Sequence, residues 1–64
     1  MEKITFIKLP HEEWFAEVGE TEIYIEKHCF DRKHWYQVYV NDKFIGQENK
    51  LNDAKELARR AVIS

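Results

Sequence analysis

Two segments in the middle of the chain, residues 22–29 and 35–40, alternate between apolar and polar side chains. A period of two is the pattern of a β-strand that buries one face and exposes the other. The positions predicted to face the core are Ile23, Ile25, Cys29, Tyr36, Val38 and Val40. The positions predicted to face outward are Glu22, Tyr24, Glu26, His28, Trp35, Gln37 and Tyr39. Residues 30–34 are polar and are predicted to form a loop between the two strands.

Earlier in the chain, residues 3–9 are rich in β-branched and aromatic side chains and are predicted to form the first strand, on an edge of the sheet. Pro10 ends that strand because proline cannot donate a hydrogen bond to a neighbouring strand. Residues 14–18 are a candidate short strand with Gly19–Thr21 as its turn, and the sequence leaves open whether they pair in the sheet.

After residue 40, the pair Asn41–Asp42 is predicted to be a two-residue hairpin turn, because Asn and Asp tolerate positive φ angles. Residues 44–47 would then return as a strand. Gly46 within it predicts a bend or a close approach of another part of the chain.

From about Asn49 the apolar spacing becomes helical, and Asn49 is the predicted N-cap. One apolar stripe is formed by Leu51, Ala54, Leu57, Ala58, Ala61 and Val62. The predicted fold class is therefore α+β: a single domain over residues 1–64 in which an antiparallel sheet of three or four strands packs against one C-terminal α-helix. The other sheet face is left for water or a partner.

Size and composition limit the kind of protein this can be. A chain of 64 residues buries about 60% of its unfolded surface, so a homodimer or a bound partner would help its stability. No apolar run approaches the roughly 18 residues of a membrane span, and residues 1–3 do not lead into a signal peptide, so we expect a cytoplasmic protein. Cys29 is the only cysteine, which excludes an internal disulfide, and we predict that it is buried.

The residues that could carry chemistry do not form an enzyme-like pattern. His28 and Cys29 are neighbours on a strand, so their side chains point to opposite faces and cannot act as a pair. One cysteine and three histidines match no zinc-binding spacing, and the two glycines do not form a phosphate-binding loop. We therefore expect a non-enzymatic protein with no metal and no cofactor.

Charge divides the chain in two. Residues 1–31 carry eight acids and three lysines, a net charge of −5, whereas residues 32–64 carry four acids and seven bases, a net charge of +3. If strands 22–29 and 35–40 pair, their outward aromatic rings meet among glutamates, as in a partner-binding surface. Packing of these rings against the first strand or a dimer mate is the alternative. The predicted partner-binding residues are Glu17, Glu20, Glu22, Tyr24, Glu26, Trp35, Gln37 and Tyr39.

Residues 38–47 followed by residues 51–62 resemble the second half of a double-stranded RNA-binding domain, which has a strand, an "NGK" hairpin, a glycine and an alanine-rich helix in this order. The predicted sheet and helix also resemble DNA binders of the AP2 and integrase arm-binding type. These resemblances imply a small nucleic-acid-binding domain. The basic residues available to it are Lys27, Arg32, Lys33, Arg59 and Arg60.

In overall character, a small acidic, aromatic-rich chain with an "IG…L.DAK..A" ending resembles small proteins of phages and mobile elements, including anti-CRISPR inhibitors. That resemblance implies a DNA-mimicking inhibitor in the host cytoplasm that covers a nucleic-acid-binding site on a host complex, such as a CRISPR surveillance complex. A positive site built for phosphates also accepts carboxylates. The matching acids are Glu12, Glu13, Glu17, Glu20, Glu22 and Glu26. This is our leading hypothesis; nucleic-acid binding is the second and a housekeeping module the third.

Overall fold

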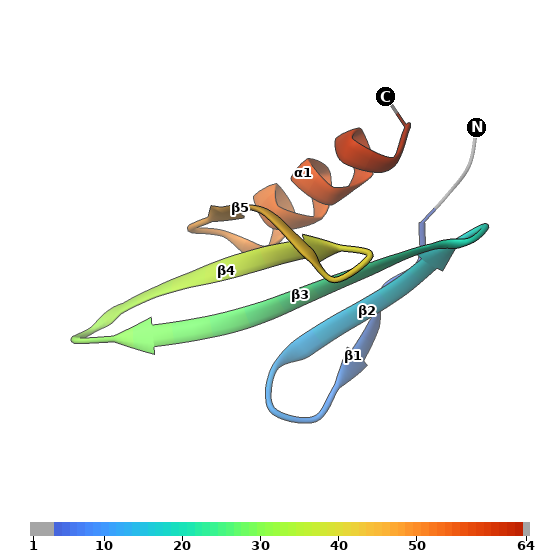
Figure 1. The fold of residues 1–64 in the computed structure, drawn as a ribbon. Helices are drawn as coiled ribbons and strands as arrows, with labels where there is room; N and C mark the ends of the chain where they lie inside the picture. Colours follow the sequence, from blue (N-terminus) through green and yellow to red (C-terminus); the bar gives the residue numbers. More distant parts are fainter. Residues whose placement is uncertain (1–3, 64) are drawn as a thin grey trace.

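Five antiparallel strands follow one another across a single sheet, and one helix covers one of its faces (Figure 1). The computed structural model describes residues 4–63. The elements are β1 (Ile7–Leu9), β2 (Glu13–Val18), β3 (Thr21–Phe30), β4 (Lys33–Val40), β5 (Lys43–Glu48) and α1 (Leu51–Ile63). The α+β class is confirmed, but the sheet has five strands rather than three or four. Residues 14–18 do pair in it, between β1 and β3.

The β3–β4 connection is shorter than predicted. The strands run to Phe30 and resume at Lys33, so residues 30–34 are not a loop. Asp31 and Arg32 form a two-residue turn with φ angles of 52° and 68°, both in the left-handed region. The predicted turn at residues 41–42 is confirmed, with φ angles of 52° and 66°. Most side chains of residues 30–34 are polar because the turn end of the β3–β4 hairpin extends beyond the helix, so both faces of the sheet meet water there (Figure 1).

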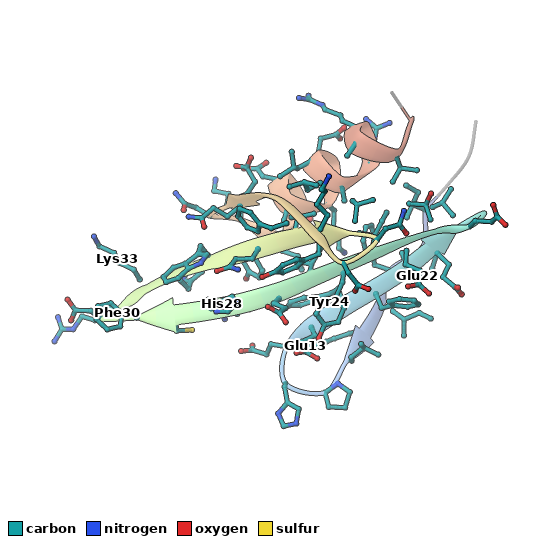
Figure 2. All side chains as sticks on the ribbon, in the orientation of Figure 1. Glu13, Glu22, Tyr24, His28, Phe30 and Lys33 are labelled. Carbon is teal, nitrogen blue, oxygen red and sulfur yellow. The ribbon has the colours of Figure 1, made fainter. Side chains whose placement is uncertain are left out.

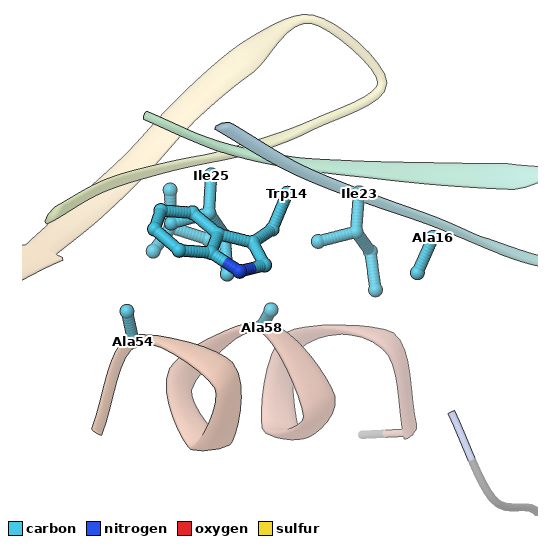
Figure 3. Close-up of a cluster of buried hydrophobic side chains, with 7 residues drawn as sticks. Trp14, Ala16, Ile23, Ile25, Ala54 and Ala58 are labelled. Carbon is cyan, nitrogen blue, oxygen red and sulfur yellow. The ribbon is translucent and has the colours of Figure 1, made fainter. Parts of the chain in front are cut away.

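The hydrophobic core lies between α1 and one face of β2, β3 and β4 (Figure 3). Ile23, Ile25 and Val38 are fully buried, as predicted. Ala54 and Ala58 are also buried, and their small side chains let the helix backbone come close to the sheet. The remaining core members are Trp14 and Ala16.

Two predictions about burial are wrong. Cys29 faces the helix side of β3 but is exposed, because it lies in the part of the hairpin that α1 does not reach. Ala61 in the predicted apolar stripe of the helix is exposed as well. The alternation of apolar residues correctly identified which face of the sheet packs against α1. It did not show how far along the strands the helix covers that face.

Gly46 makes the close approach that its position predicted. A β-carbon at this residue would lie 2.9 Å from Cδ2 of Leu57 on α1. The register of β4 and β5 also shifts here, because Val38 pairs with Gly46 and Tyr39 pairs with Phe44, which leaves Ile45 as an extra residue. The helix begins at Leu51 and the Ala54 amide donates to the Lys50 carbonyl (3.0 Å), so the cap position is Lys50 rather than Asn49.

Candidate partner-binding face

The face of the sheet opposite α1 has no other element packed on it among the described residues. Alternation along the paired strands assigns its side chains. We call this surface the open face; its residues are Ile7, Leu9, Glu13, Phe15, Glu17, Glu22, Tyr24, Glu26, His28, Phe30, Lys33, Trp35, Gln37, Tyr39, Phe44 and Gln47.

An apolar row crosses the open face at right angles to the strands. The register places five side chains next to one another, one from each strand: Ile7, Phe15, Tyr24, Tyr39 and Phe44. Ring centroids are 6.4 Å apart for Tyr24 and Tyr39 and 5.7 Å apart for Tyr39 and Phe44. Ile7 is 60% exposed and Phe44 is 50% exposed, so the row ends in accessible apolar groups at both edges of the sheet. Phe15, Tyr24 and Tyr39 between them are partly exposed. A continuous row of accessible apolar side chains is typical of an interaction surface.

Two pairs of glutamates flank this row on β2 and β3. Glu13 lies directly opposite Glu26 on one side of the Phe15–Tyr24 pair, and Glu17 lies directly opposite Glu22 on the other. Like charges facing each other across two strands destabilise a sheet. Tyr24 donates to Glu13 and His28 lies against Glu26, so contacts within the domain accompany these two carboxylates. Among the described residues, Glu17 and Glu22 form no ion pair that would offset their opposition.

Hydrogen bonds along the strands hold several open-face side chains in place. The Trp35 indole N–H donates to Oε1 of Gln37 (3.1 Å), and Nε2 of Gln37 donates to the Tyr39 hydroxyl (2.8 Å). Nε2 of His28 lies 3.1 Å from Oε1 of Glu26. A surface whose side chains are already oriented loses less conformational entropy when a partner binds.

The Tyr24 hydroxyl donates a hydrogen bond to the Glu13 carboxylate, and the two side chains lie close together in Figure 2. This hydrogen bond, with partial burial and the negative charges of Glu13 and Glu26, raises the pKa of Tyr24 to about 12. All of these effects favour the neutral phenol over the phenolate.

The tyrosine titration gives a direct test of this contact. Tyr24 should stay neutral in the folded protein above pH 10, where an ordinary tyrosine ionises. The unfolded chain then binds fewer protons than the folded one, so Tyr24's contribution to stability is complete below about pH 10 and is lost as the pH rises towards 12. In a titration followed by tyrosinate absorbance, Tyr24→Phe should remove the step at highest pH and Glu13→Gln should lower it. A wild-type curve in which every tyrosine ionises near pH 10 would contradict the contact.

Seven of the eight residues predicted from the sequence lie on the open face, and Glu20 lies outside it, in the turn between β2 and β3. The predicted partner-binding set left out Glu13, which had been named only among the matching acids, and Phe15, although both alternate with the buried Trp14 along one short segment. It also missed Ile7 and Phe44, whose positions depend on the pairing of the edge strands.

Within residues 4–63, no three His, Cys, Asp or Glu side chains come together in the way that a metal site requires. The single described helix is too short and too polar to cross a membrane. Comparison of the chain with protein-family models, with curated proteins and with solved structures finds no match.

Proposed function

We propose that this protein is a non-catalytic binding protein whose open face docks on a positively charged protein surface. The observation that carries the proposal is the placement of two directly opposed glutamate pairs on either side of an exposed apolar row. Apolar and aromatic side chains at the centre of an interface supply binding energy, and charges around them select a partner of opposite sign.

The positive surfaces that best match four close carboxylates are those that nucleic-acid-handling proteins present to phosphates. A protein that covers such a surface prevents the nucleic acid from binding there. The proposed activity is therefore inhibition of a nucleic-acid-handling complex. The resemblance in type to anti-CRISPR inhibitors makes a CRISPR surveillance complex the first partner to test.

Direct nucleic-acid binding by the helix is less well supported, because its arginines are engaged within the helix. Nη2 of Arg59 and Nε of Arg60 both contact Oε2 of Glu56, the second at 3.5 Å. Nζ of Lys27 on β3 likewise lies 3.5 Å from Oε1 of Glu12. Three of the five bases available to such a domain therefore already have carboxylate partners.

Reversing one member of each glutamate pair tests the proposal while relieving the repulsion between like charges across the strands. In the double variant Glu22→Lys and Glu26→Lys, each pair becomes a lysine opposite a glutamate, which should be more favourable by about 0.2–1 kcal/mol per pair. Wild-type protein should displace fluorescently labelled target DNA from a purified CRISPR surveillance complex. The double variant should remain folded, as circular dichroism measures, and should no longer displace the DNA.

The matched control is Glu48→Lys on β5 with Asp53→Lys on α1, which changes the net charge by the same amount away from the open face and keeps the contacts of Glu56 with Arg59 and Arg60. This control should displace the DNA as the wild type does. Displacement that is equally strong in the open-face variant would exclude the glutamate pairs as the contact. Failure of the wild type to displace DNA would exclude this complex as the partner.

A further inference from the structure

The far end of the β3–β4 hairpin forms a hollow at one end of the open face, beyond the glutamate pairs that carry the proposed function. β5 ends at Glu48, opposite Tyr36, whereas β4 extends three residues further, to Lys33. The step between the two strands leaves a hollow of about 550 Å³, which is large enough for a nucleotide. Its lining residues are Arg32, Lys33, His34, Trp35, Gln47 and Asn49.

The charge of this hollow is opposite to that of the glutamate pairs. No carboxylate lines it, whereas another hollow, beside α1, is lined by the carboxylates of Glu48, Asp53 and Glu56 together with Leu57 and Arg60. Arg32 and Lys33 are exposed, and within the described part of the chain neither forms an ion pair. Two free cations at the end of a rigid two-residue turn are suited to phosphate groups.

Trp35 supplies an oriented aromatic ring in the same hollow. Its ring stacks on that of His28, with centroids 5.9 Å apart and an interplanar angle of 11°, and its N–H is held by Gln37. Phe30 is 74% exposed on the same face of the hairpin, directly opposite Lys33 (Figure 2). Exposed rings beside basic side chains are what proteins use to stack unpaired bases.

Gln47 and Asn49 complete the lining with side-chain amides. An amide offers both hydrogen-bond donors and an acceptor, and so complements the edge of a nucleobase. The hollow thus combines an aromatic ring for stacking (Trp35), two amides that can hydrogen-bond to a base edge (Gln47 and Asn49) and two cations (Arg32 and Lys33). A peptide added to the free edge of β4 would use the backbone there and would not need this combination.

We propose that this hollow binds single-stranded nucleic acid. One base stacks on Trp35, the adjoining phosphates contact Arg32 and Lys33, and a neighbouring base reaches Phe30. A single strand is favoured over a duplex because its bases are free to leave their neighbours and stack on protein rings. The site goes beyond the proposed function. It shares Lys33, Trp35 and Gln47 with the open face, and the Glu13–Glu26 pair is next along that face to the His28–Trp35 pair, so a partner that covers the whole open face would displace the single strand.

Fluorescence anisotropy with a labelled oligothymidine of about 12 nucleotides tests the site at low salt. Wild-type protein should bind, and binding should weaken as salt is added. Trp35→Ala should weaken binding about tenfold or more, which is within the range for loss of one base–aromatic stack. Trp35→Phe keeps a ring and should retain most of the binding, which separates stacking from any effect on folding. Lys33→Glu should weaken binding, whereas Lys43→Glu, at the other end of β4, should not.

Four results would overturn the proposal: no binding by the wild type, equal binding by Trp35→Ala, equal affinity for a duplex of the same length, or competition by inorganic polyphosphate as strong as by unlabelled oligothymidine. A peptide that competes while Trp35→Ala has no effect would point instead to strand addition. The Glu22→Lys, Glu26→Lys variant should still bind the oligonucleotide. Loss of binding in that variant would contradict a site limited to the end of the hairpin, whereas failure to displace DNA from the complex concerns the glutamate pairs alone, so the two failures are distinguishable.

Discussion

Replacing Trp14 by alanine is expected to cost about 3–5 kcal/mol of folding stability, which is a large part of what a domain of this size possesses. Trp14 is the only large side chain that β2 contributes to the buried core. Its ring lies between the sheet and α1 beside Ile23 and Ile25 (Figure 3), and its centroid is 5.7 Å from that of Tyr36. Removing it leaves a cavity between the sheet and α1 that the small side chains of Ala54 and Ala58 cannot fill.

Phe15→Ala is the matched control, because Phe15 is the next residue on the same strand and points to the open face. It is partly exposed, so its loss should cost clearly less than the loss of Trp14. Urea denaturation followed by far-ultraviolet circular dichroism measures both. Equal destabilisation by the two variants would mean that the aromatic rings of the open face stabilise the fold as much as the core does. That result would weaken the proposal that these rings bind a partner.

The sequence predicted the central strands well because one of their faces is covered by a helix with a clear apolar stripe. Ile23, Ile25 and Val38 alternate cleanly, and all three are fully buried. The prediction failed at residues 29–34, where Cys29 is exposed and the supposed loop is strand and tight turn. A run of polar residues occurs both in a loop and in the end of a hairpin that no helix covers. Only the length and placement of α1 distinguish the two.

The sequence predicted the outward side chains of the two central strands, but not how the five strands bring them together with those of the edge strands. Tyr24 and Tyr39 were expected to meet because a single hairpin joins their strands. The opposition of Glu13 to Glu26 depends on the register of β2 with β3, which the sequence left open together with the existence of β2. The apolar row also requires that β1 pairs with β2, which places Ile7 beside Phe15. It requires the extra residue Ile45 in β5 as well, because a shift of one residue exchanges the two faces of a strand and would turn Phe44 away from Tyr39.

Gly46→Ala is expected to destabilise the domain by about 1–3 kcal/mol, the cost of strained backbone or of overpacking in a core. The new methyl group would lie 2.9 Å from Cδ2 of Leu57, and Gly46 has a φ of 158°, which residues with a side chain rarely adopt. Thermal or urea denaturation of the variant measures the loss. Stability equal to that of the wild type would contradict the close approach of helix and strand at this residue.

A double-mutant cycle with Leu57→Ala separates the two causes. If the contact with Leu57 dominates, Gly46→Ala should cost less in the Leu57→Ala background, because the methyl group then has room. If the backbone conformation dominates, the cost should be the same in both backgrounds. The distinction bears on the open face, since Gly46 lies next to the extra residue that keeps Phe44 in the apolar row and turns Ile45 towards the core. If the backbone conformation causes the destabilisation, glycine is needed at residue 46 to maintain the register of β4 and β5. That register in turn places Phe44 at one end of the proposed binding surface.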